Sequence, residues 1–597
     1  MDYQTYEKMK PQEMAYAEAL IEKIRTSKDP LVRYKDVRPI FDLKHTMLTS
    51  AVIYKDNVLF YVKDSHSSPY RPITYGEAKE MVDALGTALV SLGLQGKRIG
   101  IIGENRYEWA LSYLATVCGT GVAVPLDKEL PPAELEALLT EAEVACVICS
   151  GKYEALFSDI KARGETPLSI LISMDQPKGE GVLSFHELME KGRKLLEEGD
   201  TSFVDALLDR DAMAVLIFTS GTTGVAKGVM LSHLNLVTDM MTTPPLMNTR
   251  STDIFFSVLP IHHTYECTCG FLVPFYRGSA IAYCEGLKYI TKNLAEARPT
   301  IFLGVPLIFE NMYKKIWASV RKSGQEAKLR KLLKINRFTR KLGINLVPKK
   351  ITDVFGGRMR VVICGGAAID PAILKGIKDF GIIALQGYGL TECAPMIALN
   401  PDKGMKDDAA GYIPPGMQVR IEDPDPETGI GEICAKGDNV MLGYYNDPEA
   451  TAEVIIDGWF HTGDLGFLDD EGFVHITGRK KNVIITKNGK NVFPEEVEYY
   501  LSRIPYVEES MVWGKESEET GETLIFASIR VNDEEVEELL GKDPAVEDVE
   551  ALLWKDIDGI NLELPFFKRI KKIKVRKEPF EKTTGQKIKR FVESNKG

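Results

Sequence analysis

The most informative stretch of this chain is MAVLIFTSGTTGVAKGV, at residues 213–229, in which an apolar run is followed by a loop rich in glycine and hydroxyl residues. Met213–Phe218 has the composition of a buried strand, and the loop after it, Thr219–Val229, collects hydroxyls, glycines and one lysine. Backbone amides left open by glycine form an anion cradle with the hydroxyls, and Lys227 adds a charge suited to a polyphosphate. Because Gly228 follows Lys227, the loop lacks the G-K-[ST] ending of a Walker loop. The run predicts a phosphate-binding loop, with an ordinary Ser/Thr/Gly-rich surface turn as the alternative.

Length and composition indicate a globular protein of more than one domain. The 597 residues exceed one ordinary core, and 44% of them are hydrophobic and 27% charged. No apolar stretch is long enough to span a bilayer, and the polar start at Met1–Glu13 does not resemble a signal peptide. Nine cysteines in so long a chain favour reduced thiols and a cytoplasmic location. Cys146 and Cys149 lie in an apolar run, which favours a buried strand over a redox or zinc site.

Apolar runs alternate with helical patterns from about residue 70 to 400, which predicts an α/β fold with largely parallel sheets. The expected strands are Arg98–Gly103, Val122–Pro125, Val144–Cys149, Met213–Phe218, Ala280–Tyr283, Thr300–Gly304 and Arg360–Cys364. Helices are expected at Ala133–Glu141 and at Gln12–Ser27. The domain limits that we predict are an N-terminal extension over 1–70, a large domain over 71–478 with a β-barrel-like part at 412–478, a hinge at 479–482, and a small mobile α+β domain over 483–597.

The charge is unevenly distributed. The whole chain carries −12, which argues against nucleic acid as a partner, yet residues 314–350 hold 13 Lys and Arg against one acid, Glu326. This segment therefore carries +12 and the remainder −24. Leu329, Leu332, Leu333 and Ile335 interleave with the bases in a helical pattern. The pattern fits a basic amphipathic helix at an anionic membrane surface, and a solvated helical face or a protein contact is the alternative.

Five further motifs follow the loop in a fixed order: LPIHHTYE at 259–266, QGYGLTE at 386–392, GE at 431–432 with MLGY at 441–444, WFHTGD at 459–464, and GRKK at 478–481. Together with the loop they resemble the adenylate-forming superfamily, and within it the AMP-forming long-chain fatty acid–CoA ligases. The resemblance covers about residues 213–590. It implies a ligase that attaches a carboxylate to the α-phosphorus of ATP, expels pyrophosphate, and then makes a thioester with coenzyme A.

The resemblance also assigns roles to individual residues for binding ATP and Mg²⁺. Thr219, Ser220, Gly221, Thr222, Thr223, Gly224 and Lys227 should hold the phosphates, with Glu392 and Thr219 on Mg²⁺ and Thr391 on the α-phosphate. The adenine side should be formed by Gly365, Gly366, Ala367, Gly387, Tyr388 and Gly389, the ribose should be bound by Asp464, and Arg479 should lie near ribose or phosphate. Carboxylate and hydroxyl oxygens are ligands that suit Mg²⁺. His263 should lie beside the acyl pocket.

The mobile parts are assigned in the same way. The catalytic lysine corresponds to Lys587, although Gln586 stands where relatives usually have glycine. The resemblance places the hinge at Lys481 and the glycine of the pantetheine tunnel at Gly489. The fatty acid, ATP and CoA are the implied substrates. Two alternatives stay open: the same chemistry loading the phosphopantetheine of an acyl carrier protein, and a non-catalytic fatty-acid binding protein on an enzyme scaffold.

Overall fold

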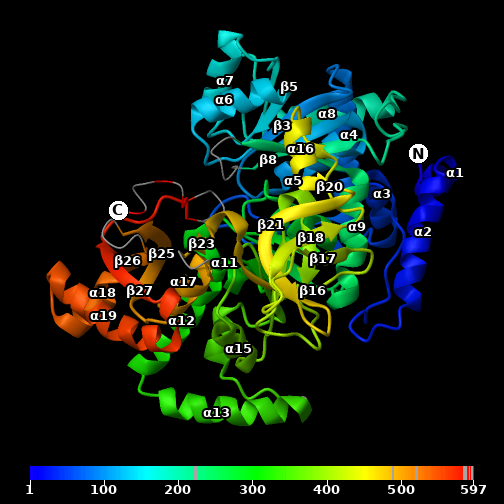
Figure 1. Cartoon of the computed structure of the whole chain (residues 1–597). Coiled ribbons are helices and arrows are strands. Elements are labelled where there is room, and N and C mark those ends of the chain that lie inside the picture. The colour runs from blue at the N-terminus through cyan, green and yellow to red at the C-terminus, as the bar shows by residue number, and fades with distance from the viewer. Residues whose placement is uncertain are drawn as a thin grey trace. The chain divides into compact units, whose positions relative to one another are not determined.

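The computed structural model describes residues 1–219, 226–342, 344–486, 490–517, 522–582, 588–590, 592 and 596 (Figure 1). Two compact units share the chain. Among the described residues, the first comprises 1–219, 226–419 and 435–460, and the second comprises 420–434 and those from 461 onward. The predicted limits at residues 70 and 478 stay predictions.

The first unit contains a sheet with the order β19-β9-β8-β4-β3-β5-β6-β7. From β8 to β7 the neighbouring strands are parallel, and β9 is antiparallel to β8. The strands are β3 (Lys97–Ile102), β4 (Gly121–Pro125), β5 (Val144–Cys149), β6 (Ile170–Ser173), β7 (Leu183–Ser184), β8 (Met213–Thr219), β9 (Lys227–Ser232) and β19 (Gly443–Tyr444). Its helices include α4 (Tyr75–Ser91), α5 (Tyr107–Ala115), α6 (Pro132–Glu141), α7 (Glu154–Arg163), α8 (Phe185–Glu197), α9 (His233–Thr242) and α16 (Pro448–Val454).

A second sheet of the same unit follows the order β16-β15-β14-β13-β12-β10-β11-β1-β2. Strands β14 to β1 pair in parallel, as predicted for this half of the chain. The strands are β1 (Val58–Val62), β2 (Arg71–Thr74), β10 (Ile254–Ser257), β11 (Ala280–Tyr283), β12 (Ile301–Gly304), β13 (Val361–Cys364), β14 (Ile383–Gly389), β15 (Met396–Leu399) and β16 (Gly411–Tyr412). Its helices include α10 (Val273–Arg277), α11 (Ile290–Ala297), α12 (Pro306–Lys322), α13 (Glu326–Thr339), α14 (Lys349–Val354) and α15 (Pro371–Asp379).

The N-terminal residues join this unit. The expected helix is confirmed as α2 (Pro11–Thr26), which begins with a proline at its first position. It lies between α1 (Tyr3–Met9) and α3 (Leu43–Ile53). The fully buried Tyr6 donates a hydrogen bond to Asp42 over 2.7 Å. Because β1 pairs with β11, the segment 1–70 also supplies a strand of the second sheet.

The second unit has its own strands and core. Most residues of β17 (Gln418–Glu422), β18 (Gly431–Lys436), β21 (Trp459–Leu468) and β22 (Phe473–Arg479) belong to it, and these strands are consecutive neighbours in their sheet. The short strand β20 (Ile455–Ile456), which pairs with the first residues of β21, belongs to the first unit. Beyond them lie β23 (Ile484–Ile485), β24 (Asn491–Val492), and the sheet of β25 (Val507–Glu516), β26 (Thr523–Val531) and β27 (Ile570–Arg576). Helices α17 (Pro494–Ser502), α18 (Asp533–Leu540) and α19 (Val546–Glu563) complete this C-terminal part, and residues such as Val497, Ile529 and Leu553 form its core. The predicted α/β class with a smaller α+β domain is confirmed.

Two predictions about particular side chains are tested by burial. All nine cysteines are free and buried, and burial raises the pKa of Cys149 to about 12, which agrees with a structural role for this thiol.

The apolar stripe predicted for 329–335 is wrong in part, because Leu329 and Leu333 belong to the core while only Ile335 is exposed. Over the described ranges, no helix combines the length and hydropathy needed to cross a membrane.

Candidate active site

The predicted phosphate loop connects two paired strands. Thr219 ends β8 and Lys227 begins β9, and the two residues pair in the antiparallel register. The Thr219 hydroxyl lies 3.5 Å from the carbonyl oxygen of Lys227. The predicted residues Ser220, Gly221, Thr222, Thr223 and Gly224 lie outside the described residues. The two ends of the loop are therefore fixed by strand pairing.

Tyr444 brings two predicted phosphate and metal residues to one place. The ammonium of Lys227 lies 4.7 Å from the centre of the Tyr444 ring, and the Tyr444 hydroxyl donates a 2.9 Å hydrogen bond to Oε1 of Glu392. The pairing of β19 with β9 sets Tyr444 opposite Val229, close to Lys227. Tyr444 lies in the MLGY motif, but the sequence assigned no role to it. The motif could have marked Tyr444 as a functional residue, whereas its contacts with Lys227 and Glu392 depend on tertiary structure.

A buried polar cluster fixes the short helix η6 (Thr391–Cys393), which carries Thr391 and Glu392. Asn439, 1% exposed, donates to the carbonyl oxygen of Met396 over 2.6 Å, and its Nδ2 lies 2.9 Å from the carbonyl oxygen of Cys393. Oδ1 of Asp239 also lies 2.9 Å from this nitrogen, and Oδ2 accepts from the Met396 amide over 2.8 Å. Burial raises the pKa of Asp239 well above its usual range. Neither Asp239 nor Asn439 was predicted, and no motif marks them.

Local structure explains why glycine occurs at several of the positions predicted to bind adenine. A side chain at Gly365 would place its Cβ 2.9 Å from the ring of Tyr265, whose hydroxyl donates to the carbonyl oxygen of Ile363 over 3.0 Å. Gly366 has a positive φ of 82°, which favours glycine. At Gly389 a Cβ would lie 2.0 Å from the Pro395 carbonyl oxygen. The remaining three predicted adenine residues are Ala367, which follows β13 and is exposed, Gly387, which lies on β14, and Tyr388, which lies on β14 and is 8% exposed.

The second unit carries the predicted ribose residues. Asp464 on β21 pairs with Arg479 on β22, and Oδ1 of Asp464 lies 2.6 Å from Nε of Arg479. Asp464 is 5% exposed, and its amide donates to the Thr462 hydroxyl over 3.0 Å. The two predicted residues are thus adjacent and form an ion pair across the two strands.

The predicted hinge residue, Lys481, comes two residues after Arg479 in the sequence. Lys481 is exposed in the short turn Lys480–Asn482, while the neighbouring Lys480 forms a 2.8 Å ion pair with Glu432. Gly489 and Lys587 lie outside the described residues. Lys582 and Ile588 form an antiparallel bridge on either side of the segment that contains Lys587.

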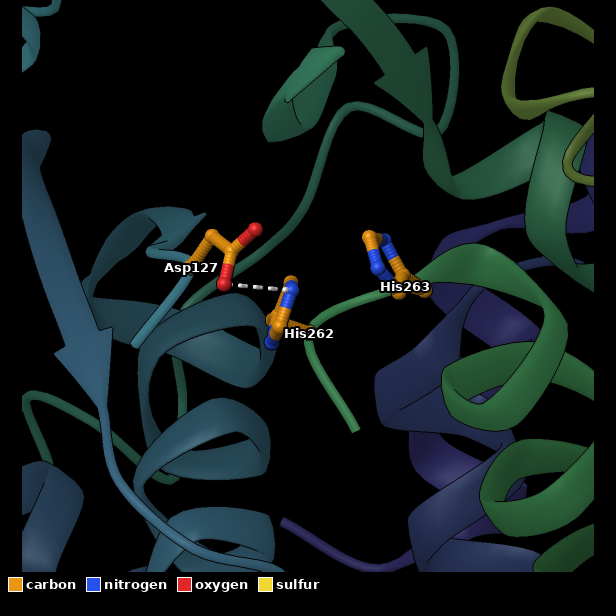
Figure 2. Close-up of side chains that lie close together, drawn as sticks. All are labelled: Asp127, His262 and His263. Atoms are coloured by element: carbon orange, nitrogen blue, oxygen red, sulfur yellow. Dashed lines mark ion pairs between the residues drawn. The ribbon is translucent and has the colours of Figure 1, made fainter. Parts of the chain in front are cut away.

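The motif at 259–266 contributes a polar group at the end of β10. His262 is 5% exposed, and its Nε2 lies 3.4 Å from Oδ1 of Asp127, which follows β4 (Figure 2). The ring of His263 lies beside it, with the ring centres 4.2 Å apart. Glu266, four residues on, is fully buried, and burial raises its pKa to about 8. Sequence interpretation singled out His263 alone in this group.

Comparison with known families defines the class of protein. The AMP-binding enzyme family matches residues 50–445, and the AMP-binding enzyme C-terminal domain matches residues 481–593. The chain belongs to the AMP-binding enzyme family.

Similar proteins include the peroxisomal long chain acyl-CoA synthetase 6 of Arabidopsis thaliana, 31% identical over 487 residues, which are 76% of this chain and 68% of the plant protein. Fatty acyl-CoA synthetase B of Dictyostelium discoideum is 27% identical over 578 residues, 90% of this chain and 83% of its own. Among solved structures, ATP-bound MatB from Rhodopseudomonas palustris superposes with a TM-score of 0.71 at 26% identity, covering 92% of this chain and 97% of MatB.

Proposed function

We propose that this protein activates a long-chain fatty acid with ATP to an acyl-adenylate and transfers the acyl group to the thiol of coenzyme A, releasing AMP and pyrophosphate. The observation that carries the proposal is the contact of Tyr444 with both Lys227, at one end of the predicted phosphate loop, and Glu392 on η6. The names of the relatives support the choice of a long-chain acid and of CoA.

The chemistry explains why such a site is needed. A carboxylate is a poor electrophile because nucleophilic attack on it would have to expel oxide, whereas an acyl-adenylate has a good leaving group. Forming the adenylate brings the carboxylate and the α-phosphate, both anions, together. Catalysis therefore consists mainly of positioning and charge neutralisation. Lys227 provides positive charge for the phosphates, and Lys587 is proposed to bridge the carboxylate and the α-phosphate.

The described residues fit a magnesium ion at Glu392. One oxygen of this partly exposed carboxylate accepts from Tyr444, and the other has no hydrogen-bond partner among the residues that the structure describes. A carboxylate oxygen and the hydroxyl predicted to assist it, that of Thr219, are donors that suit Mg²⁺, which usually keeps several waters and binds substrate phosphates. When bound, Mg²⁺ neutralises charge on the phosphates.

The remaining roles follow from the same assignment. Thr391 would bond the α-phosphate and Tyr388 would stack on adenine. Asp464 would accept the ribose hydroxyls, which requires Arg479 to share this carboxylate with the nucleotide. For the second half-reaction, Lys481 would serve as the hinge and Gly489 would line the pantetheine tunnel.

Pyrophosphate exchange into ATP, measured across fatty acids of increasing length, tests the first half-reaction. Exchange should require Mg²⁺ and should be strongest with long-chain acids, and Glu392→Gln should abolish it. Thioester formation measured with CoA and with holo acyl carrier protein then distinguishes the two acceptors. If no acid supports exchange, the binding-protein alternative replaces the proposal.

We further propose that helix α13 holds the protein at an anionic membrane, where fatty acids partition. Leu329 and Leu333 face the core, whereas Ile335, Phe338 and Leu342 are 47%, 68% and 69% exposed. Because these three residues are spaced three and four positions apart, they form a second, exposed apolar stripe on α13 and the turn after it. Lys328, Lys331 and Lys334 are exposed beside it and make no ion pair with any described residue. Apolar side chains among cations favour an anionic lipid surface over water or an acidic protein.

Sedimentation with phosphatidylglycerol vesicles tests this contact. The protein should bind at low salt and be released at high salt, and the double variant Phe338→Ser/Leu342→Ser should lose binding. Leu562→Ser/Phe566→Ser, at residues 79% and 72% exposed in the second unit, is the matched control and should bind normally. Absence of wild-type binding at every salt concentration, or equal loss in both double variants, overturns the assignment.

A further inference from the structure

Three potential metal ligands meet between the two sheets of the first unit. They are a carboxylate oxygen of Asp127 and one ring nitrogen each of His262 and His263, and all three atoms lie within 4.8 Å of one another. Asp127 follows the carboxyl end of β4, and the histidines follow the carboxyl end of β10 (Figure 2). We propose that these three residues bind a divalent transition-metal ion of the Zn²⁺ class.

The spacing of the donors supports this assignment. Ligands at about 2.0–2.1 Å from a tetrahedral zinc ion lie roughly 3.3 Å apart. Oδ1 of Asp127 and Nε2 of His262 lie 3.4 Å apart, which is long for a hydrogen bond and right for two ligands of one ion. Nε2 of His262 is buried and makes no hydrogen bond with any described residue. Two imidazoles and one carboxylate are donors that suit Zn²⁺ or Fe²⁺ and leave coordination positions open.

Asn105 fixes the loop that carries the histidines. Its Nδ2 donates to the carbonyl oxygen of Leu259 over 2.6 Å and to the hydroxyl of Ser257 over 2.9 Å, and its Oδ1 accepts from the Ile261 amide over 3.2 Å. Asp127 is held from its own side, because Oδ1 accepts from the Glu129 amide over 2.9 Å. A site whose ligands are positioned before the ion arrives loses less entropy on binding.

Metal binding would act on the acyl side of the reaction. His263 belongs to the motif assigned to the acyl pocket, so an ion that takes its imidazole should slow adenylation. This consequence rests on the proposed function, whereas the metal site itself does not.

Titration of chelator-treated, full-length protein with Co²⁺, a spectroscopic substitute for Zn²⁺, tests the site without any substrate. Wild type should bind one equivalent with visible d–d absorption, and Zn²⁺ should displace it. Asp127→Asn and His262→Gln should each weaken the affinity at least tenfold while their circular dichroism stays that of wild type.

Two controls locate the ion. His186→Gln changes an exposed histidine, and His461→Gln changes the histidine beside Cys434 and Glu432, which is the competing cluster. Both variants should bind Co²⁺ as wild type does. Absence of the absorption band in wild type, or its loss in His461→Gln but not in His262→Gln, overturns the proposal. Zn²⁺ should also inhibit pyrophosphate exchange in wild type but not in Asp127→Asn, and equal inhibition of both would overturn the link to adenylation.

Discussion

Tyr444 is the residue through which the lysine and the carboxylate of the predicted phosphate site are connected. We predict that Tyr444→Phe, which keeps the ring near Lys227 and removes the bond to Glu392, lowers the exchange rate at subsaturating Mg·ATP. A hydrogen bond to a charged group contributes about 1.5–3 kcal/mol, so the loss should be tenfold or more. This loss is measured by following the rate of pyrophosphate exchange as a function of Mg²⁺ concentration. Tyr445→Phe, one residue along, is the matched control, and an equal loss in both variants would remove the role given to Tyr444.

Glu266 should make stability depend on pH. Its pKa is raised by burial from 4.5 to about 8 in the folded state. Between these values the unfolded chain releases a proton that the folded chain keeps, so the free energy of unfolding falls as pH rises from about 4.5 to about 8. Glu266→Gln lacks this proton, and its stability relative to wild type should increase by up to about 1.4 kcal/mol per pH unit in that window.

Urea unfolding at pH 5 to 8.5 would measure the effect of Glu266. Glu197→Gln, at an exposed glutamate that ends α8, should follow the wild-type curve. Parallel curves for Glu266→Gln and wild type would show that this carboxyl is ionised in the folded protein.

At the scale of elements, the short helix η6 depends on Asn439. We predict that Asn439→Ala destabilises the protein by about 2–4 kcal/mol, because Asp239 and two carbonyl oxygens lose their donor. The exchange rate should fall too, since η6 positions Thr391 and Glu392. Asn293→Ala on α11 is the control: this side chain is equally buried and makes three hydrogen bonds. It should lose stability while exchange by the folded enzyme is unchanged, and a normal exchange rate in folded Asn439→Ala would contradict the assignment.

Elements were easier to predict than contacts. The seven expected strands are all present, and no limit is shifted by more than one residue, because each is a short apolar run between turn residues. Helix α13 shows where a pattern is insufficient. Its apolar residues occupy two faces, and only packing against α12 and α15 decides that Leu333 is buried and Phe338 exposed.

In the candidate site too, individual residues could be predicted from the sequence, whereas most of their partners could not. The resemblance to the superfamily led to Lys227, Glu392, Asp464 and Arg479. The structure links Lys227 and Glu392 through Tyr444 and pairs Asp464 with Arg479. The partners Tyr444 and Asn439 come from segments about fifty residues from η6 in sequence, and the pairing of Asp127 with His262 joins two different sheets. Such contacts follow from tertiary packing and have no local signature.

At the scale of the whole molecule, the predicted functional residues are shared between the two units. Lys227, Thr391 and Glu392 belong to the first, and Asp464, Arg479 and Lys481 belong to the second. Adenylation joins the carboxylate to the α-phosphorus of ATP and expels pyrophosphate, whereas thioester formation requires a thiol to attack the carbonyl carbon. One chain therefore has to present two different sets of residues to the two half-reactions. The resemblance assigns this change to rotation at Lys481, in the turn that follows β22.

Lys481→Pro tests that assignment, because proline fixes φ near −65° and removes the amide hydrogen. We predict that pyrophosphate exchange stays within about twofold of wild type, since adenylation needs only one arrangement, while thioester formation from added acyl-adenylate and CoA falls at least tenfold. Lys481→Ala removes the same side chain but keeps the backbone free, and it should support both half-reactions. If the proline variant loses both half-reactions equally while remaining folded, residue 481 positions the second unit for all of the chemistry, and the rotation must occur elsewhere in the chain.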